Sequence, residues 1–262
     1  MIILVLILGI GAAVVVAILG LVVVRRRIPL EVLEEQHEVA GICFAVVGGL
    51  YGIILAFVMV ASWQRFETAR HQTEIEANAL TDVYRLAPGF REPARAHLMR
   101  VCKTYAHAVI DREWPAMIDH ELSHEAQDAY LELWHTVLSA SPTEASEISL
   151  YQVTLGTLER LGDARRDRMT YMRTGIPSFI WDFLVVIGGV TVAFTYFFGM
   201  RRLLPQALIT GVLAAAIAWA LVLVHEMQVP FSGAVRVPDR AFHVALRFMG
   251  EAGEDGETLS VQ

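Results

Sequence analysis

The amino-acid sequence predicts an all-α membrane protein with four transmembrane helices and a helical extramembrane domain between the second and third. Mean hydropathy is +0.48, and 55% of the 262 residues are hydrophobic, which is too apolar for one soluble domain. Charged residues nevertheless make up 19% of the chain, so its apolar residues must be concentrated in particular segments.

Four segments have the length and composition of membrane spans. Residues 2–24, 39–63 and 204–224 contain no charged residue, and residues 179–200 contain only Asp182. A helix rises about 1.5 Å per residue, so about 20 residues cross a hydrocarbon core of about 30 Å. The first segment has no basic residue before it and no clear small-residue cleavage site, so we interpret it as a retained helix.

The chain therefore divides into four predicted parts. They are transmembrane helices 1 and 2 in residues 1–63, the helical extramembrane domain in 64–178, transmembrane helices 3 and 4 in 179–226, and a C-terminal tail in 227–262. Apolar residues in the second part recur every three or four positions, which favours helices. The second span is expected to continue as one long helix until Pro88, and residues 250–262, rich in Gly and Glu, are expected to be disordered.

Composition excludes some functions. A net charge of -7 argues against a nucleic-acid partner, because binding phosphates requires a concentrated basic surface. Cys43 lies in a predicted span and Cys102 in the extramembrane domain, so neither a disulfide nor a thiolate metal site is expected. No GxGxxG, Walker or GxSxG motif occurs, and we expect neither an enzyme nor a bound cofactor.

Arginine counts on their own leave the orientation open. Five arginines occupy the two short loops, namely Arg25, Arg26, Arg27, Arg201 and Arg202. Eight flank the spans on the side of the domain, namely Arg65, Arg70, Arg165, Arg166, Arg168, Arg173, Arg236 and Arg240. Under the positive-inside rule, the first group places the short loops in the cytoplasm and the second group places the domain there, so the two groups predict opposite orientations.

Several motifs resemble those of a known family. Residues 62–70, Ser-Trp-Gln-Arg-Phe-Glu-Thr-Ala-Arg, resemble the signature that ends the second helix of bestrophins. Over about residues 38–225 the chain is more similar still to bacterial bestrophin-like membrane proteins. That similarity rests on residues 76–80, 84–86 and 113–115 and on the arginine-rich segment 165–168.

The resemblance implies a homopentamer in the inner (plasma) membrane, with a cytoplasmic helical domain and a pore lined by the second helix. The pore would conduct ions passively, and anions such as chloride are the expected class. By the same resemblance Gly49, Ile53 and Phe57 form an apolar neck, and their i, i+4, i+8 spacing puts them on one helical face. The pore mouth would carry the charges of Arg65, Glu67 and Arg70.

Each of these positions also has a simpler interpretation. Gly48, Gly49 and Gly52 are typical of close packing between membrane helices. The charges of 65–70 are typical of a solvated helix face with i,i+3 pairing. Unlike bacterial bestrophins, the chain continues after Phe57 with the apolar residues 58–61, which disfavours a wet path.

Two further motifs are candidates for chemistry. Asp182 is the one ionisable residue inside a predicted span, which makes it a candidate ion or proton site. Because it lies only about one turn after Pro177, an interfacial anchor or an interhelical hydrogen bond is the commoner role for such a residue. His120, Glu121 and His124 match HExxH, which binds zinc when it lies on one helix. Here Ser123 has the character of an N-cap between two helices, which favours a solvated loop without metal.

Two functions of different class remain. The first is a bestrophin-like oligomeric channel in membrane lipid, with the second helix lining the pore. The alternative is a non-conducting membrane scaffold or sensor whose helical domain recruits a partner. The polarity of the second span distinguishes them, because conduction requires a path that water can wet.

Overall fold

The computed structural model describes residues 2–35 and 37–250, and these residues form helices and connecting loops with no strand. Four helices are long and apolar enough to cross a membrane, at Ile7–Arg27, Glu38–Gly89, Ser178–Phe197 and Leu203–Gln228. The predicted all-α class and the four candidate spans are confirmed. One compact unit holds the described residues up to Arg65 together with Gly175–Gln228, and a second holds Phe66–Thr174 and Val229–Gly250.

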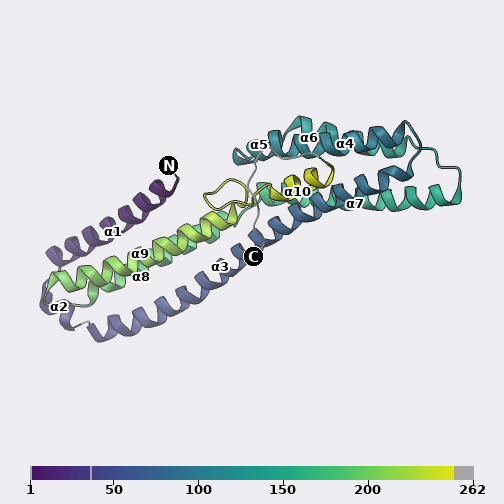
Figure 1. The fold of residues 1–262 in the computed structure, drawn as a ribbon. Coiled ribbons are helices and arrows are strands. Elements are labelled where there is room, and N and C mark those ends of the chain that lie inside the picture. The colour runs from purple at the N-terminus through teal and green to yellow at the C-terminus, as the bar shows by residue number, and fades with distance from the viewer. Residues whose placement is uncertain (1, 36, 251–262) are drawn as a thin grey trace. The chain divides into compact units, whose positions relative to one another are not determined.

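The first unit contains the candidate membrane spans. Its elements are α1 (Ile2–Arg27), α2 (Leu30–Glu35), the first part of α3 (His37–Leu86), α8 (Ser178–Phe194), η3 (Thr195–Phe197) and α9 (Leu203–Gln228). Helices α1, α8 and α9 pack against one another (Figure 1). Ala17, Val192 and Ala214 form the buried centre of this contact, where small side chains let the helix backbones approach closely.

A polar network joins these helices near one end of the unit. Gln206 donates to the Thr195 carbonyl at 3.0 Å, and its side-chain oxygen accepts from Arg25 at 2.8 Å. The hydroxyls of Thr195 and Thr210 lie 2.8 Å apart. Because an unpaired polar group is costly in an apolar environment, these mutual bonds hold α1, η3 and α9 in one arrangement.

The second unit is built from the rest of α3 and the helices that follow it. These are η1 (Ala87–Gly89), α4 (Ala94–Ala108), the π-helix η2 (Val109–Glu113), α5 (Trp114–Ile118), α6 (His124–Leu138), α7 (Ala145–Arg173) and α10 (Arg240–Phe248). The prediction of one long helix ending near Pro88 is confirmed, because α3 runs without a break to Leu86.

The core of the second unit brings together residues far apart in the sequence. It includes the fully buried Leu80 and Val83 of α3, Leu98 and Tyr105 of α4, Leu133 of α6, Leu158 of α7 and Phe242 of α10. Burying one such large apolar side chain stabilises a fold by about 1.5–3 kcal/mol. Sequence analysis assigned no helix to residues 227–250, whereas α10 buries three of its side chains here. Of the predicted disordered tail, residues 251–262 lie outside the described residues.

Candidate functional site

The α3 segment of the first unit presents one apolar face that no other described side chain covers. Gly49, Ile53 and Phe57 are all exposed, and the exposed fractions of Ile53 and Phe57 are 56% and 72%. At 100° per residue the three positions lie within 80° of helix surface. Leu50 and Val60 extend the same exposed face along the helix.

The opposite side of α3 explains this exposure, because it makes the helix contacts. Tyr51 is only 3% exposed, and its ring packs beside Gly188 of α8 and Ile217 of α9. Positions 51 and 53 are 200° apart on a helix, so a tyrosine that packs inward places Ile53 outward. The three predicted neck residues therefore share one uncovered face, as their spacing requires.

The predicted mouth charges lie at the boundary between the two units of the chain. Arg70 donates to the Glu67 carboxylate at 2.7 Å, so the predicted i,i+3 pair is present. Both side chains are partly in solvent, and such exposed pairs contribute about 0–1 kcal/mol to stability. Arg65 is half-buried and has a partner of its own.

Asp182 is exposed on α8, one turn after the helix begins, and among the described residues it makes no hydrogen bond or ion pair. The polar contacts nearby belong to other side chains. The Gln228 side-chain oxygen accepts from the Trp181 indole at 3.1 Å, and its amide lies 3.1 Å from Nδ1 of His225. Asp182 itself therefore joins no polar network that this structure describes.

The HExxH sequence does not form a zinc-binding helix. His120 lies in a turn with φ of 60°, whereas His124 is the first residue of α6. Ser123 between them caps α6 by accepting from the Ala126 amide, which confirms its predicted role. His120 Nδ1 instead lies 3.2 Å from the Met172 carbonyl, and among the described residues no group of three His, Cys, Asp or Glu side chains could hold a metal ion.

A buried charge cluster in the second unit is the feature that sequence analysis missed. It consists of Glu76 of α3, Tyr105 of α4, Glu113 of η2, and Arg165 and Arg168 of α7. All five residues are at most 2% exposed. Two arginines face two glutamates, so the formal charges balance without solvent.

The cluster contains two bidentate arginine–glutamate pairs. Arg168 donates to Glu76 at 2.6 and 2.9 Å, and also to Glu113 at 2.6 Å. Arg165 donates to both Glu113 oxygens, at 3.0 and 2.7 Å, and to the Tyr105 hydroxyl at 3.0 Å. The Tyr105 hydroxyl in turn donates to Glu76. Bidentate charge-assisted bonds are the strong class of hydrogen bond, and they fix the relative placement of three helices.

The environment keeps Tyr105 and Arg168 each in one protonation state. Burial raises the pKa of Tyr105 well above its usual value, and the charge of Glu76 raises it further. Burial on its own would lower the pKa of Arg168, but Glu76 and Glu113 outweigh it and the pKa is raised. The tyrosine therefore stays a neutral donor and the arginine a cation. The cluster therefore has a structural role: it connects the helices of the second unit, and its buried side chains are too enclosed to bind a substrate.

A signal for this cluster was present in the sequence. The buried stripe that continues from α3 into η1 contains Glu76 together with Leu80, Val83 and Ala87, which recur every three or four residues. A glutamate at such a position requires a buried cationic partner. The partners could not be identified, because Arg168 is 92 residues further along the chain.

A comparison with protein families identifies the chain. The family model for the bestrophin-like domain matches residues 11–242, which is most of the sequence. This chain belongs to the bestrophin-like family. The resemblance inferred from the sequence motifs is thus confirmed, and the match includes both α3 and the buried cluster of this bestrophin-like protein. No curated protein is significantly similar to it in sequence.

Solved structures share its fold. The crystal structure of a bacterial bestrophin homologue from Klebsiella pneumoniae matches with a TM-score of 0.69 at 14% identity, covering 93% of this chain and 100% of that one. A mutant of that homologue gives 0.68 at 15% identity, covering 92% and 97%. The crystal structure of a membrane protein variant also gives 0.68 at 15%, covering 93% and 100%. At this identity the likeness shows the bestrophin-like fold.

Proposed function

We propose that this bestrophin-like protein is the subunit of an oligomeric membrane channel that conducts ions passively, with anions as the preferred class. The pore would be lined by α3, with Gly49, Ile53 and Phe57 as its neck. The observation that supports this proposal is the exposed apolar face of α3, opposite the side that Tyr51 packs against α8 and α9. In a membrane such a face meets lipid, a neighbouring subunit or a pore.

The chemistry of the face favours a constriction. Phe57 is 72% exposed, and no atom lies within 4 Å of the point where a Cβ of residue 49 would be. Side-chain size on this face therefore increases from Gly49 to Phe57. A ring of phenylalanines around a symmetry axis would make a hydrophobic gate that opens and closes by wetting. A pentamer is the assembly that the family resemblance suggests.

The orientation belongs to the same proposal. With the second unit in the cytoplasm, eight of the arginines that flank the spans lie on the cytoplasmic side, and the five in the short loops lie on the other side. This larger cytoplasmic count agrees with the positive-inside rule. The protein would then be a multi-pass protein of the inner membrane. An activity other than passive transport is not part of the proposal, since no described cluster has the arrangement of a catalytic site.

The test is ion flux from liposomes that contain the purified full-length protein, with chloride and sodium compared. Phe57→Ala enlarges the proposed neck and is expected to change the flux several-fold. Phe179→Ala is the matched control, because Phe179 is a similarly exposed phenylalanine (69%) of the first unit, but on α8. An unchanged flux in Phe57→Ala beside a conducting parent would remove α3 from the pore.

A non-conducting scaffold is the second candidate, and the apolar residues that follow Phe57 favour it. Val60 is 52% exposed and continues the apolar face towards Ser62. The Ser62 hydroxyl donates to the Val58 carbonyl at 2.8 Å. Such a face is suited to lipid or to a neighbouring helix. Absence of flux from parent and variants alike, with the oligomer shown to be intact, would favour the scaffold.

A further inference from the structure

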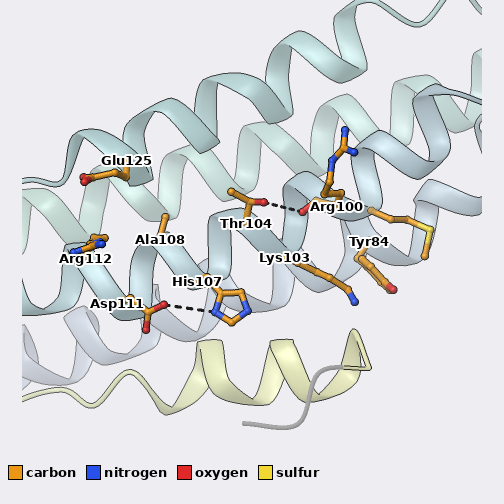
Figure 2. Close-up of a pocket in the computed structure, with 10 residues that line it drawn as sticks. Tyr84, Arg100, Lys103, Thr104, His107, Ala108, Asp111, Arg112 and Glu125 are labelled. Atoms are coloured by element: carbon orange, nitrogen blue, oxygen red, sulfur yellow. Dashed lines mark hydrogen bonds and ion pairs between the residues drawn. The ribbon is translucent and has the colours of Figure 1, made fainter. Parts of the chain in front are cut away.

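The second unit contains an open cavity of about 710 Å³, and most of the residues that line it are charged or polar (Figure 2). Most of the lining comes from one side of α4 and the adjoining η2, as Arg100, Lys103, Thr104, His107, Ala108, Asp111 and Arg112. Met99 also belongs to α4, Tyr84 comes from α3 and Glu125 from α6. This volume lies within the range of ligand sites, about 300–1,000 Å³.

The charges in the cavity favour an anionic occupant. Arg100, Lys103 and Arg112 supply three full positive charges, against the two carboxylates of Asp111 and Glu125. Both carboxylates already have partners within the lining or beside it. Asp111 lies 3.6 Å from Nδ1 of His107, and Glu125 accepts from the Ser123 hydroxyl at 2.8 Å, a bond that lowers its pKa.

The sequence beyond the described residues is of the opposite charge. Residues 251–262 read Glu-Ala-Gly-Glu-Asp-Gly-Glu-Thr-Leu-Ser-Val-Gln, with four acids and no Lys, Arg or His. This short segment thus carries four negative charges, in a chain whose total is -7. Three of its four acids lie within the four positions from Glu254 to Glu257, close enough to engage several cations of one cavity.

The described part of the chain also ends beside the cavity, next to Tyr84. Tyr84, which lines the cavity, donates from its hydroxyl to the Met249 carbonyl at 3.3 Å. The neighbouring Arg85 holds its guanidinium 4.3 Å from the centre of the Phe248 ring. Gly250, with φ of 83°, then turns the chain out of the α10 helix. These contacts fix the point from which the acidic segment starts.

We propose that the acidic segment 251–262 binds in this cavity, with its carboxylates paired to Arg100, Lys103 and Arg112. The distances allow it. The stretch of helix from Arg100 to Arg112 is about 18 Å long at about 1.5 Å per residue, whereas an extended chain gains about 3.3 Å per residue. Residues 250–257 alone can therefore span the basic face.

Attachment to the chain makes weak contacts sufficient. A segment tethered by a short linker has an effective concentration in the millimolar range, so a few exposed ion pairs can keep it bound. Its binding would be electrostatic and partly exposed, and it would weaken as salt shortens the Debye length from about 10 Å at 0.1 M to about 3 Å at 1 M. Salt sensitivity is therefore a signature of the proposal.

The experiment follows cleavage of the full-length protein by a glutamate-specific protease, with release of residues 258–262 measured by mass spectrometry. Lys103→Glu is expected to accelerate cleavage after Glu257 by about tenfold at low salt. Arg160→Glu is the matched control, because Arg160 is an exposed arginine of α7 outside the cavity lining, and its reversal should leave the rate unchanged. In 1 M salt the parent should be cut as fast as Lys103→Glu.

A charge swap separates binding from a folding defect. Adding Glu254→Lys to Lys103→Glu restores one opposite-charge pair, keeps the Glu257 cleavage site, and is expected to restore most of the protection. Equal rates in the parent, Lys103→Glu and Arg160→Glu at low salt would overturn the proposal. So would protection that appears only when inorganic phosphate is added, because the cavity would then serve a free anion. None of these results depends on whether the protein conducts ions.

Discussion

The guanidinium of Arg168 and the carboxylate of Glu76 form a two-point ion pair across 92 residues of sequence, at 2.6 and 2.9 Å. Neither side chain is exposed to solvent. The pair joins α7 to the extension of α3, and Glu113 gives the same arginine a second carboxylate partner at 2.6 Å. Because every charge here has a partner, the cluster specifies one packing of these helices against alternatives.

Removal of one member of this cluster is expected to cost far more than removal of an exposed arginine. Arg168→Met leaves the buried carboxylate of Glu76 without its cationic partner, and breaking a buried ion pair in this way destabilises by about 3–5 kcal/mol. Thermal unfolding of the purified protein should show a clear fall in midpoint. Arg166→Met is the control, because the Arg166 side chain on the same helix is 68% exposed and its ion pair among the described residues is with Asp163, one turn earlier.

The double variant Arg168→Met with Glu76→Gln tests whether the cost comes from the unpaired charge. Neutralising Glu76 in the Arg168→Met background is expected to recover part of the lost stability, so the two changes will not be additive. Full additivity would mean that the two side chains stabilise the fold independently, contrary to the geometry.

Sequence reasoning recovered the features that depend on local pattern. The uncharged stretches located the four candidate spans, Ser123 marked the start of α6, and the break at Pro88 marked the end of α3. The face that holds Ile53 and Phe57 also followed from helical spacing. Each of these depends on residues within one or two helical turns.

Features that depend on distant residues were not recovered. The partners of Glu76 and Glu113 lie 92 and 52 residues away, and no local pattern specifies them. Helix α10 has only 9 residues, and the helical spacing of its buried residues Phe242, Ala245 and Leu246 was overlooked. So short a helix is stable only through burial of such residues in the second unit. The π-helix that ends at Glu113 likewise has no reliable sequence signal.

Gly188 is predicted to be essential for the packing of α3 in the first unit. A Cβ at this position would lie 2.8 Å from the Tyr51 hydroxyl oxygen, closer than Cβ atoms pack, and a tight 3.2 Å from Cγ2 of Ile217. Gly188→Ala should therefore destabilise the protein by about 1–3 kcal/mol, the usual cost of overpacking. The adjacent Gly189→Ala is the control, since nothing lies within 4 Å of that Cβ.

Removal of the Tyr51 hydroxyl should relieve the clash. This oxygen is buried and has no hydrogen-bond partner among the described residues, so Tyr51→Phe alone is expected to be neutral or mildly stabilising. In the Gly188→Ala background it should restore most of the unfolding midpoint. If Gly188→Ala unfolds at the same temperature as Gly189→Ala, the proposed contact between α3 and α8 is wrong.

The N-cap of α6 gives a prediction that is independent of the charge cluster. The Ser123 hydroxyl oxygen accepts from the Ala126 amide at 3.3 Å and satisfies one of the free donors at the helix start. Ser123→Ala should cost about 1 kcal/mol, and Ser123→Asp, which can also accept this bond, should cost less. Unfolding curves that rank alanine above aspartate in stability would contradict the capping role.

The N-terminus of α7 makes stability depend on pH through Glu147. Its carboxylate accepts from the backbone amides of Thr143 at 2.9 Å and Glu144 at 3.3 Å, and Arg91 lies 2.6 Å away. These bonds lower the pKa of Glu147 below its ordinary value of 4.5, with the Thr143 amide as the largest cause. A carboxyl whose pKa is lowered on folding stabilises the fold above its unfolded pKa.

The direction of the pKa shift of Glu147 determines how stability should change with pH. The contribution of Glu147 should be fully present above pH 4.5 and disappear as the pH falls through the lowered pKa of the folded protein. Glu147→Gln retains an oxygen that can accept from the amides but removes the charge, so the variant should be less stable than the parent at pH 7. The difference in unfolding midpoint should then shrink as the pH falls below 4.5. A difference that stays constant with pH would mean that the carboxylate charge does not stabilise this helix start.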